Sequence, residues 1–413
     1  MNDRLKHNNE TEKELLVLPS IAARRGLDGH LILTKKYQAG VAEYARIWPG
    51  KVTSLVFIDN RPSTEMDLIP VLPSSSNPGL EIRPRDPKEL AMRVQNAAVV
   101  FAGLTGDELE LAQICNRLSV PLVFNSEYTL KTEKQIIDAN TKNPILRWRR
   151  KLWANKNHAR RMNALRLATS LQCSGTPTYR EYSKLKSDTL LFFDNRVKES
   201  DLISSEELAT KLRSIGSKPL RLAFGGRFVP MKGVLDLIAV ADELVENELE
   251  FSFTIVGEGP LEQTLRQSIN QRGLSGRVKL KPPMDFASGW IPFLKSHVDL
   301  FVCCHPQGDP SSTYPEVMSC GVPIVGYANE AFEGIAELSG GGRSTAPSPK
   351  AVAAEIIRIV DQGILPDLAR KARIFALEHA FENTFINRVA HMVKSSRLGL
   401  STKSTWFSSH DLC

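Results

Sequence analysis

Short apolar runs alternate with longer segments of helical periodicity along most of the chain. In the first half we expect strands at 14–19, 53–59, 97–103, 121–126 and 189–194, and helices at 35–48, 88–97 and 107–118. In the second half we expect strands at 220–226, 251–257, 277–281, 298–304 and 323–327, and helices at 233–247 and 260–273. Strands that alternate with helices in this way predict parallel sheets with crossover helices.

A polar stretch separates the two halves. Within it, Ser204 is followed three positions later by Glu207, which is the pattern of a capping box at the start of a short helix. We therefore predict an α/β protein with two tandem, doubly wound Rossmann-like domains. The predicted segments are a first domain at 1–197, a linker at 198–219, a second domain at 220–375, a long helix at 376–400 and a flexible tail at 401–413.

The composition, with 42% apolar and 24% charged residues, fits a globular protein of 413 residues. The amino terminus is polar and lacks the apolar core of a signal peptide, and no apolar run approaches the roughly 20 residues that span a bilayer. The six cysteines include no C-x-x-C pair, which favours reduced thiols. We therefore expect a cytoplasmic protein.

Much of the formal net charge of +7 lies in the segment 145–166. A basic, amphipathic helix with tryptophans is typical of a helix that lies on a membrane surface. The alternatives are a packed helix with a solvated basic face and a nucleic-acid surface, which is less favoured because no nucleic-acid module accompanies it. The apolar stripe at helical spacing consists of Ile145, Trp148, Leu152, Ala159 and Met162. The basic residues are Arg147, Arg149, Arg150, Lys151, Lys156, Arg160, Arg161 and Arg166.

A glycine-containing loop with two cations follows the strand at 220–226. Loops between a strand's carboxyl end and the next helix are where doubly wound sheets bind ligands, and a helix start favours anions. Arg227 and Lys232 could both point toward one phosphate group, the arginine as a fork and the lysine as a point charge. The alternative is a solvated loop with two ordinary surface charges.

The segment 303–323 combines thiols, a histidine and two acids. A metal site is disfavoured because Cys303 and Cys304 point to opposite faces of a strand and no second cluster completes a tetrahedral set. A thiol nucleophile is disfavoured because His305 is poorly placed to act as its base, so buried apolar thiols are expected. His305 is expected at the rim of a ligand pocket or bonded to its own backbone neighbourhood.

A short helix is expected within the same segment. Ser312 or Thr313 would cap it, Pro315 would occupy its first turn, and Gly321 would end it. Thr313 and Glu316 also have the spacing of a capping box, in which the glutamate would bond back to the chain.

Three motifs in order give the chain a family resemblance over about 220–345. They are Gly226-Arg227 with Lys232-Gly233, the turn Gly257-Glu258-Gly259, and Asp309 with Glu316 ahead of Cys320-Gly321-Val322-Pro323. The segment resembles the carboxyl-terminal domain of GT-B glycosyltransferases of family four, also called group 1. Two differences are that the first acid is an aspartate in place of glutamate and that six residues, in place of seven, separate the acids.

The resemblance implies a role for each matched residue. Arg227 and Lys232 would hold the diphosphate of a nucleotide-sugar donor, Glu316 the ribose, and Asp309 the transferred sugar. Cations and helix-end amides suit this reaction, because negative charge grows on the leaving phosphate while the sugar ring becomes oxocarbenium-like. Further donor-binding candidates are Gly226, Gly257, Gly259, Ser311, Ser312, Thr313 and His305.

The acceptor is expected at the strand ends of the first domain. The candidates there are Arg24, Arg25, Lys35, Asn125, Glu127 and Tyr128, none of which belongs to a motif. The resemblance implies a retaining, metal-independent hexosyltransferase without a cofactor, a last helix that crosses back to the first domain, and a role in polysaccharide or glycolipid synthesis at the inner face of the membrane. The alternative is a non-catalytic nucleotide-sugar-binding or scaffold protein of the same fold.

Overall fold

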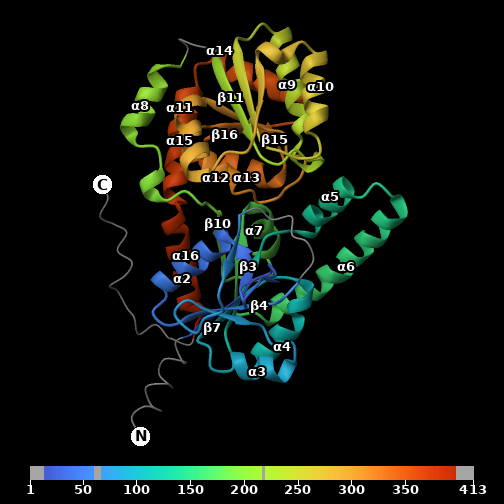
Figure 1. Ribbon diagram of the computed structural model, residues 1–413, viewed down its shortest axis with the longest axis vertical. Helices are drawn as coiled ribbons and strands as arrows, with labels where there is room; N and C mark the ends of the chain where they lie inside the picture. Colours follow the sequence, from blue (N-terminus) through green and yellow to red (C-terminus); the bar gives the residue numbers. More distant parts are fainter. Residues whose placement is uncertain (1–13, 60–66, 216–218, 397–413) are drawn as a thin grey trace.

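The computed structural model describes residues 14–59, 67–215 and 219–396, so the predicted tail at 401–413 and part of the predicted linker lie outside it. The described residues form two α/β units, which lie one above the other in Figure 1. The first strands of both units are apolar runs buried on both faces, as expected for central strands of parallel sheets. The predicted fold class of two doubly wound α/β units is confirmed.

The first sheet is parallel and has the strand order β10-β9-β8-β7-β1-β4-β6. Its strands are β1 Leu15–Leu18, β4 Val52–Val56, β6 Gly79–Ile82, β7 Val99–Gly103, β8 Leu122–Ser126, β9 Ser170–Ser174 and β10 Thr189–Phe192. Its helices are α2 Lys35–Ile47, α3 Pro87–Val94, α4 Leu109–Arg117, α5 Leu130–Asn140, α6 Pro144–Leu167 and α7 Thr176–Tyr182. A small antiparallel sheet beside it contains β2 Arg24–Arg25, β3 Leu31–Thr34 and β5 Leu68–Val71.

The second sheet is parallel and has the order β13-β12-β11-β14-β15-β16. Its strands are β11 Leu220–Gly225, β12 Phe251–Val256, β13 Val278–Lys281, β14 Leu300–Cys303, β15 Ile324–Tyr327 and β16 Gly342–Thr345. The surrounding helices are α9 Val234–Glu246, α10 Glu262–Gln271, α11 Ile291–His297, α12 Thr313–Met318, α13 Glu330–Ser339 and α14 Pro349–Asp361. The strand order reverses between β11 and β14, and ligands of open α/β sheets bind at such a point.

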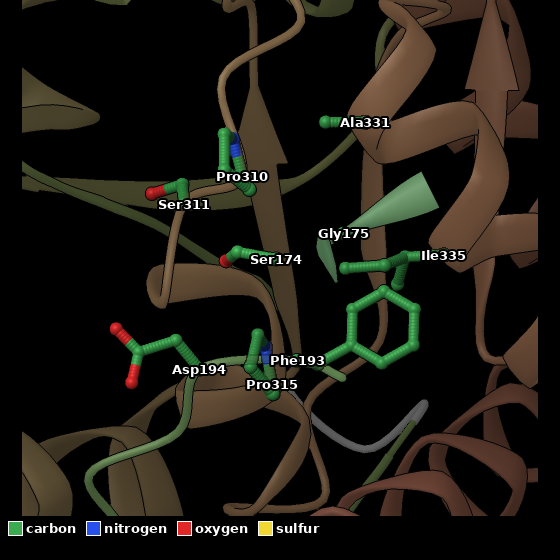
Figure 2. Close-up of a pocket in the computed structure, with 9 residues that line it drawn as sticks. All are labelled: Ser174, Gly175, Phe193, Asp194, Pro310, Ser311, Pro315, Ala331 and Ile335. Atoms are coloured by element: carbon green, nitrogen blue, oxygen red, sulfur yellow. The ribbon is translucent and has the colours of Figure 1, made fainter. Parts of the chain in front are cut away.

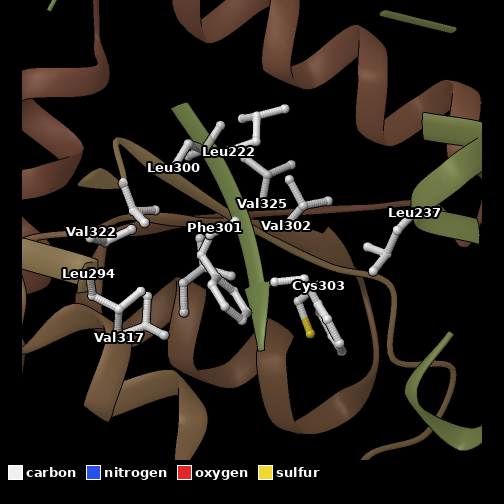
Figure 3. Packing of buried hydrophobic residues seen from close by; sticks show 14 of the residues in the cluster. Leu222, Leu237, Leu294, Leu300, Phe301, Val302, Cys303, Val317, Val322 and Val325 are labelled. Atoms are coloured by element: carbon white, nitrogen blue, oxygen red, sulfur yellow. The ribbon is translucent and has the colours of Figure 1, made fainter. Parts of the chain in front are cut away.

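The core of the second unit surrounds β14. Phe301, Val302 and Cys303 are fully buried there, and Figure 3 shows the Cys303 sulfur among aliphatic and aromatic side chains. Burial raises the pKa of the Cys303 thiol to about 11. All five cysteines in the described ranges are free and buried, which confirms the expected reduced, apolar thiols for that part of the chain.

Two segments of chain cross between the units side by side. One follows β10 and leads to α8 Ser205–Arg213, whose start carries the predicted capping box of Ser204 and Glu207. The other joins α15 Leu365–Glu378, which packs in the second unit, to α16 Phe381–Ser395, which packs on α2 and on strands of the first sheet. The two crossings are hydrogen bonded, from Phe381 N to Val197 O at 3.0 Å and from the Asn195 side chain to His379 O at 3.1 Å.

The predicted crossing of the last helix back to the first unit is confirmed, but the long helix predicted at 376–400 is interrupted near its start. His379 and Ala380 leave the helical conformation between α15 and α16. The interruption allows α16 to leave the second unit and bury Phe385, Val389 and Met392 against the first. Tertiary packing therefore overrides the local helical pattern at this point.

Candidate active site

Lys232 and Asp309 meet at the point where the strand order of the second sheet reverses. Lys232 ends the short helix Pro230–Lys232 after β11, and Asp309 lies in the loop after β14, the strand that pairs with β11. The Lys232 Nζ atom lies 3.3 Å from Asp309 Oδ2, and both side chains are mostly buried. The second carboxylate oxygen of Asp309 is buried without a hydrogen-bond partner among the described residues.

Close backbone contacts explain the glycines around this pair. Gly233 adopts the left-handed conformation with φ 59°, and a Cβ atom there would lie 1.9 Å from Cys304 O. A Cβ atom on Gly257 would lie 2.0 Å from Gly226 O, so the turns after β11 and β12 touch through bare backbone. Gly259 packs in the same way on the backbone of Phe228. The motif glycines thus keep the loops of the predicted donor site together.

Arg227 has a different environment from Lys232. Its side chain is exposed, and no residue in the described ranges forms an ion pair or hydrogen bond with its guanidinium. The two cations that we expected to act together are therefore in different states, with Lys232 paired and Arg227 available to solvent.

Glu316 is buried and pairs with an arginine from the other side of the domain boundary. Its carboxylate accepts hydrogen bonds from Arg196 Nε at 2.6 Å and Arg196 Nη2 at 3.2 Å, and its residue is 2% exposed. Arg196 lies in the crossing segment after β10, and its guanidinium stacks 3.9 Å above the centre of the Phe286 ring. The capping-box alternative for Glu316 is wrong, because the carboxylate bonds to Arg196 and not to the start of its own helix.

The start of α12 also differs from the expectation. Ser312 is the residue before the helix, yet neither its side chain nor that of Thr313 caps the backbone. Ser311 N donates to Asp309 O at 2.8 Å, so the chain enters α12 through a tight turn. The predicted helix end is correct: Gly321 has φ 61° and donates to Met318 O.

His305 and Gln307 are enclosed in the loop after β14. His305 is 2% exposed, so it does not lie at the rim of a pocket, and its Nδ1 atom lies 3.3 Å from the Tyr314 hydroxyl. Burial, with a smaller contribution from Lys232, lowers the pKa of His305 well below its usual range. Gln307 is 1% exposed, and both polar atoms of its amide are buried without a partner in the described residues. Such atoms normally mark a position where water or a ligand completes the hydrogen bonding.

Helix α5 of the first unit holds this same loop. The Thr132 hydroxyl donates to Gly308 O at 3.3 Å, and Gly308 N donates to the Gln135 side chain at 3.2 Å. Lys131 forms an ion pair with Glu330 of α13 in the second unit. Figure 2 shows a small pocket nearby, which is lined by Ser174 and Asp194 from the first unit and by Ser311 from the second. The two units are therefore in contact around the predicted donor site.

The structure places the predicted acceptor residues at several positions. Arg24 and Arg25 form β2, in the small sheet that was not predicted, and not a loop at a strand end of the main sheet. Lys35 begins α2 and faces the second unit, where it contributes a little to the lowered pKa of Asp285, which hydrogen bonds from Ser288 mainly cause. At the end of β8, Asn125 has a buried side-chain oxygen without a partner among the described residues, while Glu127 and Tyr128 are exposed.

A hollow of about 520 Å³ lies beside β2. It is lined by Arg25, Phe57, Ile58, Asp59, Ile82, Arg83 and Arg85, from segments around the carboxyl ends of β4 and β6. The guanidinium of Arg83 is held by Glu108 at 2.6 and 2.8 Å. The hollow is the larger of the two pockets described here, and it has a basic lining.

The outer half of α6 carries apolar side chains without a protein partner. Figure 1 shows α5 and α6 projecting from the side of the first unit. Ile145, Trp148, Leu152 and Trp153 are 71%, 63%, 47% and 64% exposed. The alternative of a fully packed helix is therefore wrong for this half, although Met162 farther along α6 does pack on the core. No helix in the described ranges has the length and apolar character needed to cross a bilayer.

Three comparisons with known proteins bear on the class of this chain. Residues 206–375 match the family model described as glycosyl transferases group 1. A 2-deoxystreptamine N-acetyl-D-glucosaminyltransferase from Streptomyces fradiae is 25% identical over 130 residues, which are 30% of this chain and 30% of that protein. The match thus spans less than a third of this curated relative.

Solved structures show the same fold at low identity. Alr3699/HepE from Anabaena, in complex with UDP, has a TM-score of 0.61 and 14% identity, with 92% of this chain and 100% of that chain covered. Sucrose-phosphate synthase from Thermosynechococcus elongatus has a TM-score of 0.58 and 14% identity, with coverage of 91% and 97%.

The two parallel sheets and the likeness to these solved structures define the GT-B fold. More narrowly, residues 206–375 are similar to the glycosyl transferases of group 1. The resemblance seen in the three sequence motifs is thereby confirmed.

No motif in the sequence pointed to Arg196 and Gln307. Arg196 is 120 residues from its partner Glu316, and Gln307 is distinguished only by its burial without partners. Within the described ranges, no group of three or more His, Cys, Asp or Glu side chains is arranged to hold a metal ion.

Proposed function

We propose that this enzyme transfers a hexose-type sugar from a nucleoside-diphosphate donor to a hydroxyl group of a saccharide acceptor. The observation that carries the proposal is the ion pair of Lys232 and Asp309, which joins the loops after β11 and β14 at the carboxyl edge of the second sheet. The exposed Arg227 belongs to the same loop as Lys232, and α12 with Glu316 follows the loop of Asp309. A cation facing a departing diphosphate stabilises the charge that develops as the glycosidic bond breaks. In support, the related HepE structure was solved with UDP.

In the proposed reaction each group has one task. Arg227 and Lys232 bind the diphosphate, and Lys232 exchanges its bond to Asp309 for a bond to a phosphate oxygen. Asp309 then turns toward the sugar, where its unpartnered oxygen and the Gln307 amide accept or donate hydrogen bonds to hydroxyl groups. We propose that the configuration at the anomeric carbon is retained, that the leaving diphosphate accepts the acceptor's proton, and that no metal ion or cofactor takes part.

We propose that the acceptor enters from the first unit, along the side that includes Asn125 and the basic hollow near Arg25. Arginine side chains bind carboxylate and phosphate groups in a planar, two-point geometry. Because Glu108 already holds Arg83, the exposed Arg85 is the arginine of this lining that we assign to an acidic sugar or a phosphate of the acceptor.

We propose that the outer half of α6 rests on the cytoplasmic surface of a membrane and brings the enzyme to a lipid-linked acceptor for polysaccharide or glycolipid synthesis. The exposed tryptophans can insert at the level of the lipid headgroups. The exposed cations Arg149, Lys156 and Arg160 have no ion-pair partner in the described part of the chain and are available to anionic lipids.

The donor assignment is tested by thermal unfolding with UDP-, GDP- and ADP-sugars, followed by assays of donor hydrolysis. We expect one nucleotide class to raise the unfolding temperature of the wild type, and Arg227→Ala to lose most of that shift. Arg266→Ala, an exposed arginine on α10 in the same unit, is the matched control. Stabilisation by none of the donors would exclude the transferase, and binding without hydrolysis or transfer would favour a non-catalytic nucleotide-sugar-binding protein.

A further inference from the structure

The carboxylate of Glu316 reaches the donor site already bound to Arg196. The two hydrogen bonds, at 2.6 and 3.2 Å, run from Nε and Nη2 to the two different carboxylate oxygens. This side-on pairing fixes the plane of the carboxylate and uses one lone pair on each oxygen, so a second lone pair on each oxygen stays available. A carboxylate held in this way is oriented before any ligand arrives.

The guanidinium of Arg196 is itself held in place. The Phe286 ring stacks on it at 3.9 Å, which restricts rotation of the guanidinium plane. Two residues before Arg196, the Asp194 carboxylate forms an ion pair with Lys36 of α2 at 2.5 Å. Although burial would raise the pKa of Asp194, the positive charges of Lys36, Arg388 and Arg196 hold it below its ordinary value. The charges of Lys36, Asp194, Arg196 and Glu316 therefore alternate from the first unit to α12 of the second.

We propose that Arg196 is a positioning residue of the donor site, which holds the Glu316 carboxylate in one orientation so that the ribose hydroxyls of the nucleotide bond to its remaining lone pairs. Because the arginine belongs to the crossing segment of the first unit, the pair makes recognition of the ribose depend on both units. The inference rests on the proposed donor binding and assigns a residue outside the motifs of the second unit.

The orientation of Glu316 needs this partner. A carboxylate with 3% of its side chain exposed loses most of its hydration, and an unpaired charge in such a position is costly. Without the arginine, the carboxylate would therefore turn toward another partner or toward water. Its lone pairs would then no longer point toward the ribose hydroxyls, and those hydrogen bonds would weaken.

The test compares nucleotides with and without ribose hydroxyls. Dissociation constants of UDP, GDP and ADP, and of their 2′-deoxy and 3′-deoxy forms, are measured by calorimetry for the wild type and for Arg196→Gln. For the nucleotide that binds the wild type, we expect loss of the relevant hydroxyl to weaken binding about 10-fold or more, as for a hydrogen bond to a charged group. The quantity compared is the hydroxyl ratio, which is the dissociation constant of the deoxy nucleotide divided by that of the parent nucleotide. In Arg196→Gln we expect the hydroxyl ratio to fall to about two.

Arg221→Gln is the matched control. Arg221 makes the same kind of two-point pair with Asp299, at 3.0 and 2.6 Å, at the amino-terminal edge of the same sheet. This variant loses a comparable ion pair away from the donor site, so the hydroxyl ratio should stay at the wild-type value. Arg196→Lys keeps the positive charge but lacks the two-point guanidinium geometry, so its hydroxyl ratio should lie between those of Arg196→Gln and the wild type.

The outcomes separate the inference from the function on which it rests. If the wild type binds none of the nucleotides, the proposed donor binding fails. If the wild type discriminates against the deoxy forms and Arg196→Gln keeps the full ratio while all affinities fall together, Arg196 is only a structural contact and the inference is overturned. Wild-type binding without any discrimination overturns it as well. Circular dichroism and thermal unfolding of each variant establish that it is folded.

Discussion

The Lys232 ammonium group lies 3.3 Å from the Asp309 carboxylate, although 77 residues separate them in the sequence. They meet because β11 and β14 are neighbours and their following loops leave the sheet at the same edge. In the absence of donor, the acid neutralises the cation that we assign to the diphosphate. Under the proposed function, donor binding would therefore involve an exchange of partners at Lys232.

This exchange predicts opposite effects for the two partners on nucleotide binding. Lys232→Ala should weaken binding of the nucleoside diphosphate and lower kcat/KM by about 10²- to 10³-fold, as when one stabilising donor is removed from a transition state. Asp309→Asn should bind the free nucleoside diphosphate as tightly as the wild type or more tightly, because the lysine is released, while kcat falls. Calorimetry with the free nucleotide and steady-state kinetics measure the two effects. Weaker nucleotide binding in Asp309→Asn would contradict the exchange.

A second prediction concerns the buried amide of Gln307. Gln307→Leu removes two buried polar atoms without partners, so the unfolding temperature of the ligand-free protein should stay the same or rise by a few degrees. The additional shift caused by the nucleotide-sugar should shrink, while the shift caused by the bare nucleoside diphosphate should not. Gln135→Leu, on α5, is a useful comparison because its partner is the loop backbone itself. If the nucleotide-sugar still raises the unfolding temperature of Gln307→Leu above the value with bare nucleoside diphosphate by as much as in the wild type, the amide does not contact the sugar.

A third prediction concerns α6. The double variant Trp148→Glu and Trp153→Glu should lose binding to vesicles that contain anionic lipid, because a charge replaces each ring at the headgroup level. Hydrolysis of a soluble donor should be unchanged, since these side chains are exposed at the outer end of the helix. Flotation of the protein with anionic and with neutral vesicles measures the effect. A wild type that floats with neither kind of vesicle would exclude the membrane surface as the partner of α6.

A fourth prediction concerns pH. Burial between Phe193 and Phe375 lowers the pKa of His379 to about 4. Between pH 6.5 and 4 the unfolded chain takes up a proton at this histidine and the folded chain does not, so the free energy of unfolding should decrease as the pH falls through this window. We expect His379 to account for on the order of 1 to 3 kcal/mol of that decrease. Denaturant unfolding at a series of pH values should show a smaller decrease for His379→Gln than for the wild type.

Much of the architecture could be predicted because central parallel strands are continuous apolar runs. The missed strand β9 has the sequence Ser-Leu-Gln-Cys-Ser, and its polar Gln172 is buried only because it exchanges hydrogen bonds with Arg388 of α16. No proline or glycine lies at the break before α16, so the sequence carries no local signal for it. In both cases the deciding partner lies more than 180 residues away, and no local pattern contains that information.

The residues of the candidate site also fall into those that sequence motifs indicate and those that only the fold reveals. Lys232, Asp309 and Glu316 could be named as candidates because they belong to recognisable sequence motifs. Arg196 could not, because its role depends on a crossing segment that the fold brings to Glu316, and the capping-box spacing of Thr313 and Glu316 pointed to a different partner. The exposure of Trp148 was likewise a property of how far α6 extends from the first unit.

The paired crossing segments restrict how the two units can move. A single peptide connection would allow the two units to rotate relative to each other about any axis. Here the chain passes between the units twice, and the passages are tied to each other by the bonds Phe381 to Val197 and Asn195 to His379. Two crossing segments that are hydrogen bonded to each other favour rotation of the units about one axis. Because Arg196 is the next residue after Asn195, it lies beside that axis, where an opening rotation would displace atoms least. Under the proposed function, the ribose end of a donor would then stay bound while the sugar end is uncovered.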